Sequence, residues 1–238
     1  MGMDKINQLV EWLRQSAKTV VLTGAGMSTE SGVPDFRSKS GWWRNIDPST
    51  VANTEALKND YELFHAFYCA RLKALEGCEP HEGHRILAEW ESRGLIDRVA
   101  TQNVDGFHKE AGNKKVDELH GSIHAVRCQT CSTEATVEAF LAKQACASCD
   151  GKLRPGIVLF GEMLPEDAWN NAMQAIKTAD VVIVIGTSLQ VYPVNQLPKM
   201  THGKLVYINR EVDGFEQDFD LIFEASAKET LKQINAAL

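Results

Sequence analysis

The run TVVLTGAG at residues 19–26 joins a short apolar stretch directly to a glycine-rich turn. An apolar run of this length that ends in a turn is typical of a buried strand. The residues before it predict an amphipathic helix, with apolar side chains at helical spacing at Ile6, Leu9, Val10 and Leu13. We therefore expect the chain to begin with a helix, a buried strand and a glycine turn.

Four further apolar runs resemble this first strand and lie at 95–100, 157–160, 181–185 and 205–208. Amphipathic stretches lie between or after them, near 83–93, 166–178 and 226–237. Buried strands that alternate with helices indicate a parallel sheet covered on both faces. The sequence therefore predicts an α/β fold with a Rossmann-like parallel sheet and helices on both faces.

Polar or glycine residues follow four of the predicted strands: TGAG at 23–26, TQN at 101–103, GTS at 186–188 and NRE at 209–211. In an open parallel sheet the carboxyl ends of the strands line the ligand crevice. Any one of these segments could be an ordinary turn. Because the pattern recurs four times, we expect a ligand site at this edge of the sheet.

Two CxxC pairs with 14 residues between them predict a metal site at Cys128, Cys131, Cys146 and Cys149. This spacing is close to that of zinc ribbons, in which four thiolates complete a tetrahedron and leave no open position for water. A redox CxxC pair and a nucleic-acid-binding ribbon are the alternatives, but a redox role would not need a second pair. We expect a structural zinc ion, and we read Cys69 and Cys78 as small, partly buried thiols.

The composition limits the possible partners and location of the protein. The formal net charge of −7 over 238 residues gives no basic field for a phosphate backbone, so we expect no direct binding to nucleic acid. No stretch approaches the roughly 18 apolar residues that a membrane span needs, and the N-terminus lacks a signal core. We expect a cytoplasmic protein, working as a monomer, without membrane contact.

The GAG sequence at 24–26 resembles the start of a dinucleotide fingerprint, in which glycines let the backbone approach a pyrophosphate. Alone, it is weak. The last glycine of the fingerprint is replaced by Thr29, and no acidic residue closes a second strand at the usual distance. An ordinary dehydrogenase is therefore disfavoured.

The longer run GAGMSTESGVPDFR at 24–37 resembles the GAGxSxxSGxPxFR signature of the sirtuin (Sir2) family. The other motifs of that family follow in order: TQNVDG at 101–106, LHG at 119–121, the two CxxC pairs, VLFGE at 158–162, GTSLQVYP at 186–193 and INRE at 208–211. The resemblance covers essentially the whole chain and points to the bacterial class III desuccinylase and deacetylase group.

The resemblance implies a fold and a reaction. The fold would be a Rossmann-like NAD-binding domain (1–37, 81–123 and 155–238), a helical and cofactor-loop insertion (38–80) and a zinc-ribbon lobe (124–154). The reaction would remove acyl groups from protein lysine, with NAD as co-substrate, and release nicotinamide and O-acyl-ADP-ribose. The acyl-lysine protein or peptide would bind as an added strand.

The resemblance also implies roles for single residues. His120 would be the general base, because an imidazole can accept a proton from a ribose hydroxyl near neutral pH. Asn103 and Asp105 would act with it at the ribose and the nicotinamide, although Asp105 could instead cap the following helix. The NAD-binding set would be Gly24, Ala25, Gly26, Ser28, Asp35, Phe36, Arg37, Gln102, Asn103, Asp105, Gly186, Thr187, Ser188, Asn209, Glu211 and Ala227. His84 is expected to be structural.

The substrate set implied by the resemblance is Ala52, Tyr68, Arg71, Val158, Phe160, Gly161, Glu162 and Val191. Within it, Tyr68 and Arg71 match the Tyr-x-x-Arg pair of sirtuins that accept malonyl, succinyl or glutaryl lysine, and Ala52 matches the small residue that enlarges their acyl pocket. An arginine fork beside a phenol is suited to a carboxylate. The alternative is that the two residues simply lie one helical turn apart, one packed and one solvated.

Two other functions compete with deacylation. A mono-ADP-ribosyltransferase would share the scaffold and differ only in the nucleophile that meets the ribose. The intact LHG motif and the Tyr-x-x-Arg pair favour deacylation. A non-catalytic NAD-sensing adaptor is disfavoured because it would not require His120, Asn103 and Asp105 together.

Overall fold

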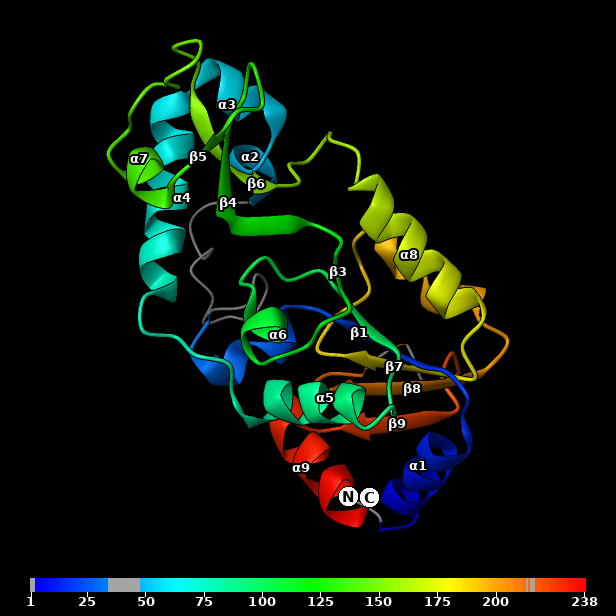
Figure 1. Cartoon of the computed structure of the whole chain (residues 1–238). Coiled ribbons are helices and arrows are strands. Elements are labelled where there is room, and N and C mark those ends of the chain that lie inside the picture. The colour runs from blue at the N-terminus through cyan, green and yellow to red at the C-terminus, as the bar shows by residue number, and fades with distance from the viewer. Residues whose placement is uncertain (1–2, 34–47, 213, 215–216) are drawn as a thin grey trace.

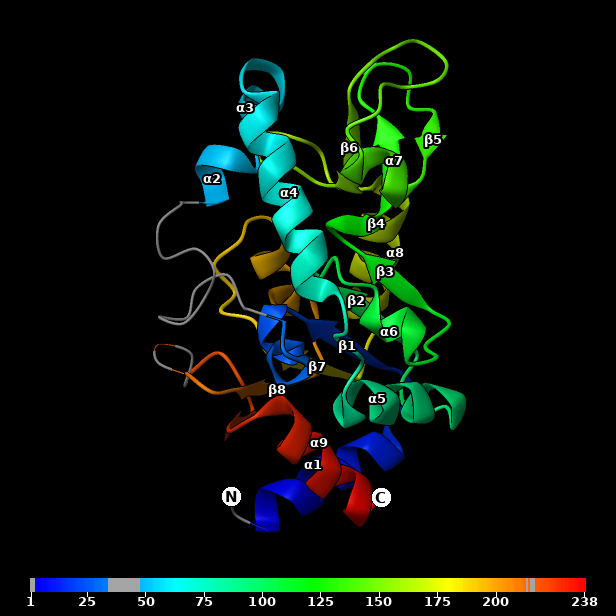
Figure 2. The ribbon, with the colours of Figure 1, turned by 90° about the vertical axis from the view of Figure 1, so that its left-hand side faces the viewer.

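The computed structural model describes residues 3–33, 48–212, 214 and 217–238. They form two lobes, a larger one around a six-stranded sheet and a smaller one of helices and a three-stranded sheet (Figures 1 and 2). The first and last helices, α1 (Met3–Gln15) and α9 (Ala227–Ala237), lie together at the far end of the larger lobe. There the Arg14 guanidinium donates to the Leu238 carbonyl at 2.8 Å.

The large sheet is parallel throughout, in the order β3-β2-β1-β7-β8-β9. Its strands are β1 (Thr19–Thr23), β2 (Arg98–Thr101), β3 (Val116–Glu118), β7 (Val181–Ile185), β8 (Lys204–Asn209) and β9 (Leu221–Glu224). From β1 the chain adds β2 and β3 toward one edge of the sheet. It then returns to β7, beside β1, and adds β8 and β9 toward the other edge. This reversal between β1 and β7 is the point at which ligands bind in doubly wound sheets.

Alternating residues of the central strands pack against opposite layers of helices. Val21 packs with α1, α9 and α5 (Glu82–Ser92), whereas Val20 and Leu22 pack with α8 (Glu166–Lys177). This follows from the two-residue period of a strand. Because the helix layers on both sides present apolar residues, β1 is buried on both of its faces. The predicted α/β fold with a doubly covered parallel sheet is confirmed.

The smaller lobe contains residues 48–75 of the predicted helical segment together with the cysteine-bearing segment. Its sheet has the antiparallel order β5-β4-β6, from β4 (Gly121–Cys128), β5 (Glu134–Ala135) and β6 (Leu153–Ile157). Its helices are α2 (Pro48–Val51), α3 (Thr54–Asn59), α4 (Tyr61–Leu75) and α7 (Val137–Leu141). These elements share one core, which we call the small-lobe core: Val51, Leu57, Phe64, Phe67, Tyr68, Leu72, Ile123, Val126, Cys128, Phe140, Cys146, Leu153, Ile157 and Leu159.

One strand prediction was wrong. The run 157–160 does not join the parallel sheet, since the strand there is β6, which ends at Ile157 and pairs antiparallel with β4. Its apolar residues are explained differently: Ile157 and Leu159 fill the small-lobe core, while Phe160 is 53% exposed. The short strands β3 and β9 at the sheet edges and the four-residue helix α6 (Phe107–Glu110) were not predicted.

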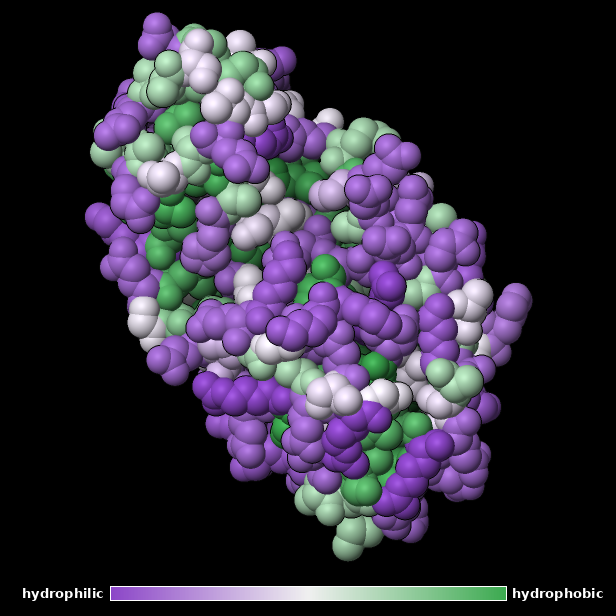
Figure 3. All heavy atoms as spheres, viewed as in Figure 1, coloured by the Kyte–Doolittle hydropathy of each residue, from purple (hydrophilic) through white to green (hydrophobic). Residues whose placement is uncertain are grey.

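The surface of the protein is mixed. On the face seen in Figure 3, hydrophilic residues predominate and apolar ones show as small patches among them. Among the described residues, no helix combines the length and the apolar character needed to cross a membrane.

Candidate functional site

The four polar segments predicted after strands lie side by side at one edge of the large sheet. Thr23 at the end of β1 is in register with Thr101 of β2 and with Ile185 of β7, and Ile185 is in register with Ile208 of β8. The segments 23–26, 101–103, 186–188 and 209–211 therefore meet at the carboxyl ends of adjacent strands. This edge includes the reversal between β1 and β7, as expected for a ligand crevice.

Glycines let the first and third of these segments pack backbone against backbone. The Gly26 amide donates to the Gly186 carbonyl at 2.7 Å, and the Gly24 amide donates to the Ile185 carbonyl at 3.0 Å. A Cβ on Gly24 would lie 2.6 Å from the Thr187 Cβ, and one on Gly26 would lie 2.8 Å from the Gly186 Cα. Because no side chain fits, this floor stays open backbone, the surface that a pyrophosphate needs.

A buried hydrogen-bond network joins the glycine segment to the segment after β2. The Ser28 hydroxyl donates to Asp105 Oδ2 at 2.7 Å and accepts from Asn103 Nδ2 at 3.0 Å. Asp105 Oδ1 also accepts from the Phe107 amide at the start of α6, so Asp105 serves this helix and Ser28 at once. Burial raises the pKa of Asp105, and these hydrogen bonds oppose the rise. The network fixes Asn103 and Asp105 in one arrangement.

The segments after β2, β7 and β8 are also hydrogen-bonded to one another. Gln102 Nε2 donates to Thr187 Oγ1 at 2.9 Å, and the Tyr207 hydroxyl donates to the Thr187 carbonyl at 2.7 Å. Asn209 Nδ2 donates to that same hydroxyl at 2.9 Å. Tyr207 was not among the predicted site residues, because its position inside an apolar strand indicates only core packing.

His120 contacts the segment after β2 through one of its two ring nitrogens. Its Nδ1 lies 3.1 Å from the Gln102 carbonyl oxygen, which can only accept a hydrogen bond. Nδ1 therefore carries the proton, and Nε2 keeps a lone pair. Burial lowers the pKa of His120, and the Gln102 carbonyl opposes this. The result is a neutral imidazole with a basic nitrogen in a fixed direction.

Of the remaining predicted NAD-binding residues, Ala25 is half-buried in the turn after β1. Ser188 is half-buried after β7, Glu211 is exposed after β8, and Ala227 is buried at the start of α9. Asp35, Phe36 and Arg37 lie outside the described residues. None of these positions tests the role that the sequence implies.

Three buried histidines, His81, His84 and His108, lie next to the end of β1 and the glycine segment. The centroid of the His84 ring lies 4.3 Å from that of His81 and 5.0 Å from that of His108. The His108 Nε2 lies 2.9 Å from Thr23 Oγ1, which itself donates to Thr101, so Nε2 must be the donor. Within the described part of the chain, the Nδ1 atoms of His84 and His108 have no hydrogen-bond partner. A proton added there would therefore be buried without an acceptor.

Acid is expected to destabilise the fold through this cluster. Burial lowers the pKa of His84 to about 2 and that of His108 to about 3, whereas an unfolded histidine titrates near 6.5. Below about pH 6.5 the unfolded chain binds protons that the folded chain does not, so the free energy of unfolding falls as the pH falls. Each histidine is expected to remove about 1–2 kcal/mol between pH 7 and pH 5.

Urea unfolding at pH 7, 6 and 5 measures this effect. The loss of stability between pH 7 and 5 should be smaller in His108→Asn than in the parent, whatever the stability of the variant at pH 7. His202→Asn changes an exposed histidine and should leave the pH dependence unaltered. An identical pH dependence in the parent and in His108→Asn would contradict the prediction.

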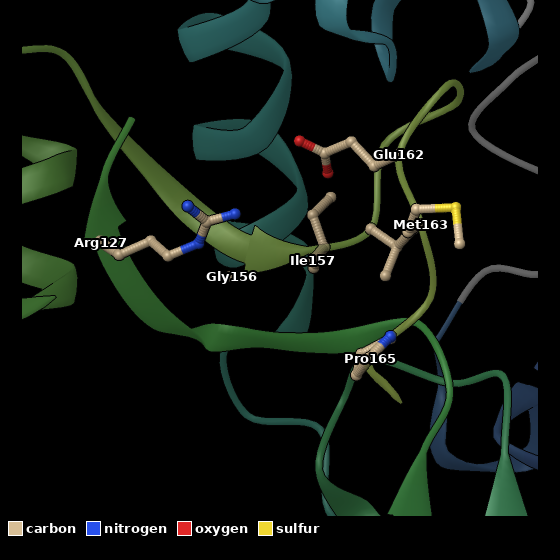
Figure 4. A pocket seen from close by; sticks show the side chains of 7 residues that line it. Arg127, Gly156, Ile157, Glu162, Met163 and Pro165 are labelled. Atoms are coloured by element: carbon tan, nitrogen blue, oxygen red, sulfur yellow. The ribbon is translucent and has the colours of Figure 1, made fainter. Parts of the chain in front are cut away.

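The predicted substrate wall follows β6 and contacts both the helical segment and His120. The Val158 amide donates to the His120 carbonyl at 2.9 Å, and the Phe160 amide donates to the Ala52 carbonyl at 2.8 Å. A hollow of about 460 Å³ adjoins this wall and is lined by Arg127, Gly156, Ile157, Val158, Glu162, Met163 and Pro165. Figure 4 shows Arg127 from β4, Ile157 from β6 and Glu162 from the loop after β6 around this hollow.

The Glu162 carboxylate is held by Arg154, a residue that was not predicted to matter. Both carboxylate oxygens accept from its guanidinium, at 2.5 and 3.0 Å. Although burial raises the pKa of Glu162, the hydrogen bonds from Arg154 and from the Leu159 amide lower it overall. The signal in the sequence was an arginine inside the otherwise apolar stretch 153–160, but nothing there identifies its partner.

Tyr68 and Arg71 lie on α4, within the wall of the small lobe. The Tyr68 ring is fully buried between Phe64 and Phe67, and the Arg71 Cζ lies 5.7 Å from its centroid. Among the described residues, the buried Tyr68 hydroxyl has no partner at ordinary hydrogen-bond geometry, although the Arg71 guanidinium lies close enough to lower its pKa. Burial raises the pKa of Tyr68 to about 12, and the nearby Arg71 charge opposes the rise.

The four predicted metal ligands converge at the tip of the small lobe. Their Sγ atoms all lie within 4.8 Å of one another, with Cys128 and Cys149 at 3.5 Å and Cys131 and Cys146 at 3.6 Å. A tetrahedral zinc ion with Zn–S bonds of about 2.3 Å requires sulfur atoms about 3.8 Å apart. The Thr130 and Ser148 amides donate to two of the sulfurs, as suits thiolates. The donor set therefore fits a closed zinc site.

Comparisons with known proteins agree with this geometry. The model of the Sir2 family matches residues 24–193. The chain is 47% identical over 235 residues to NAD-dependent protein deacetylase 1 of Geobacillus kaustophilus, covering 97% of each chain. It is 40% identical to an NAD-dependent protein deacylase of Pyrococcus furiosus, covering 96% of each.

Solved structures give the same answer. A Sir2 variant with a deacetylated p53 peptide and 3′-O-acetyl-ADP-ribose superposes with a TM-score of 0.93 at 35% identity, covering 98% of each chain. A Sir2 homologue in complex with NAD gives a TM-score of 0.92 at 36% identity, covering 99% of this chain and 94% of that one. Because the family model matches most of the chain and the relatives align over nearly its whole length, the chain belongs to the Sir2 family, the sirtuins.

Proposed function

We propose that the protein is an NAD-dependent protein lysine deacylase that uses NAD as co-substrate and carries a structural zinc ion. The observation that carries this proposal is His120, whose Nδ1 lies 3.1 Å from the Gln102 carbonyl oxygen, so that the proton sits on Nδ1 and Nε2 keeps the lone pair of a base. The sirtuin relatives are named as NAD-dependent deacetylases and deacylases, which supports the same reaction.

Each part of the crevice has a task in this reaction. The open backbone at Gly24, Gly26 and Gly186 would hold the pyrophosphate of NAD, and Gln102 and Asn103 would hold its carboxamide and ribose. NAD supplies the ribose carbon to which the acyl oxygen bonds as nicotinamide leaves. His120 Nε2 would accept the proton of a ribose hydroxyl, so that this hydroxyl can take the acyl group.

The peptide is proposed to lie as an added strand between 158–162 and 189–193. The solved relatives with p53 peptides support peptide binding by this fold. In such a mode, main-chain hydrogen bonds supply affinity for many sequences, and the modified lysine supplies recognition. The cytoplasm as the place of action and the monomer as the working form remain predictions.

Nicotinamide release in the presence and absence of an acyl-lysine peptide tests the proposal. A deacylase releases nicotinamide only with the peptide and produces acyl-ADP-ribose in equal amount, which mass spectrometry detects. An ADP-ribosyltransferase would release nicotinamide with an unacylated acceptor and add the mass of ADP-ribose to it. NAD binding without any nicotinamide release would instead indicate an NAD-sensing adaptor.

We also propose that the enzyme removes succinyl and malonyl groups besides acetyl. Support comes from the buried Tyr68 hydroxyl, which has no partner at ordinary hydrogen-bond geometry among the described residues and lies beside the Arg71 charge. A buried polar atom without a partner is costly unless a ligand supplies one. The far carboxylate of a succinyl group could accept from this hydroxyl and from the guanidinium together.

Arg71→Met is therefore expected to separate two activities. The kcat/KM for succinyl-lysine peptide should fall about 10- to 100-fold, the equivalent of lost hydrogen bonds to a charge, while that for acetyl-lysine peptide stays within about threefold. The two peptides are compared by mass spectrometry of acyl-ADP-ribose. Lys73→Met removes an exposed cation from the same helix and should change neither value. Equal losses for both peptides would mean that Arg71 is part of the scaffold.

A further inference from the structure

Arg154 is a fully buried charge at the junction of the zinc site and the substrate wall. Its side chain is 0% exposed, although it lies on β6 in a lobe with a largely apolar core. Its guanidinium is held by hydrogen bonds to Glu162, to the Ile157 carbonyl at 2.6 Å, to the Pro155 carbonyl at 3.2 Å and to Gln129 Oε1 at 3.1 Å. The cation is thus surrounded by acceptors on every side.

Two of these partners belong to different functional parts of the molecule. Gln129 lies inside the first CxxC pair, next to Cys128. Its backbone N–H donates to the Lys152 carbonyl at 2.9 Å. Glu162 lies at the end of the substrate wall, and its Oε2 also accepts from the Leu159 amide at 2.9 Å. One guanidinium therefore joins the zinc ribbon to the loop that would bind the peptide.

Such a buried pair does more for geometry than for stability. The cost of removing the guanidinium and most of the carboxylate, which is 22% exposed, from water offsets most of their attraction, so a well-packed apolar pair would often be as stable. The bidentate contact between Arg154 and Glu162, however, specifies one orientation of both groups. The Leu159 amide then ties that orientation to the backbone of 158–162. The arrangement is suited to holding a loop in one conformation.

We propose that Arg154 is a positioning residue that couples the metal-bound ribbon to the peptide-binding loop 158–163. The ribbon holds Gln129 in place, and Gln129 and Glu162 together orient the Arg154 guanidinium. The guanidinium in turn holds the loop in the conformation that would bind the peptide as an added strand. The inference rests on the proposed function and goes beyond it. Affinity for acyl-lysine peptide should therefore depend on this contact more than affinity for NAD does.

Three variants of the zinc-loaded enzyme test the coupling. Arg154→Lys keeps the charge but loses the fork, Glu162→Gln keeps the shape but loses the charge, and Gln129→Ala removes the contact from the ribbon side. We expect the KM for acetyl-lysine peptide to rise about tenfold in the first two and about threefold in the third. The KM for NAD and kcat should stay within about twofold. Arg98→Lys is a matched control, because Arg98 pairs with Asp117 at 2.9 Å in the large sheet and not with the loop.

Hydrogen exchange supplies a second readout that does not require turnover. The amides of 158–163 should exchange faster in Glu162→Gln and Gln129→Ala than in the parent, while those of β1 and β7 keep their protection. Zinc content is measured in the same samples to establish that the ribbon is loaded. If Arg154→Lys does not fold, the other two variants carry the test.

Two results would overturn the coupling. One is an unchanged peptide KM together with unchanged exchange at 158–163 in zinc-loaded variants. The other is a parallel loss of kcat and of both KM values, which marks Arg154 as a general structural residue. Failure of the proposed function is distinct, because the parent enzyme itself would then release no nicotinamide with the peptide, whereas the exchange measurement could still be made.

Discussion

Replacing His120 with alanine is expected to lower kcat by about 10²- to 10⁴-fold, the usual contribution of a positioned general base. The reason is geometric: the Gln102 carbonyl fixes the proton on Nδ1 and leaves Nε2 as the basic atom of the ring. Burial lowers the pKa of His120, so the ring is neutral and able to accept a proton at pH 7. Alanine removes the base and leaves the open backbone of the glycine segments in place.

Two measurements on the same protein separate this role from a structural one. Nicotinamide release with acetyl-lysine peptide reports turnover, and calorimetric titration reports NAD binding, which should stay within about threefold of the parent. His120→Asn can keep a donor toward Gln102 but offers no base, so it should be as inactive as the alanine variant. His202→Ala changes an exposed histidine and should be fully active. Turnover that survives in both His120 variants would refute the mechanism.

The sequence predicted those parts of the molecule that depend on short-range pattern. The run at 19–26 is apolar on both faces and ends in glycine, so its burial and its turn could be read directly. The segments after β1, β2, β7 and β8 could then be placed together, because parallel strands bring their carboxyl ends to one edge. The CxxC pairs could be read for a similar reason, since two residues between cysteines allow both thiolates to reach one ion.

Contacts between distant segments could not be read in this way. Arg154 was visible as a charge in an apolar stretch, yet its partners Gln129 and Glu162 come from two other segments. The histidine cluster likewise brings His81 and His84 of one segment against His108 of another. The run at 157–160 misled the strand prediction, because an apolar stretch that crosses from one sheet to a loop has the same composition as a buried strand.

Zinc removal is expected to abolish turnover by unfolding the small lobe. Cys128 and Cys146 are buried in the small-lobe core beside Phe140 and Leu153, so the metal site is part of that core. In zinc-finger peptides structural zinc supplies about 10–16 kcal/mol of apparent binding free energy, and such domains unfold without it. Loss of the ion would release β4 and β6, and with them the Val158 amide that bonds the His120 carbonyl.

Thiol counting and hydrogen exchange measure the two halves of this prediction. Of the six cysteines, only Cys69 and Cys78 should react with a thiol reagent before chelation, and all six after it. Cys146→Ser should lose the zinc ion, and protection of amides across 121–157 should fall while β1 and β7 stay protected. Cys78→Ser, which changes a cysteine outside the cluster, should keep zinc and activity. A zinc-free protein that still deacylates the peptide would show that the apolar contacts of the small-lobe core suffice to hold the substrate wall, and that the ribbon is no structural necessity for the reaction.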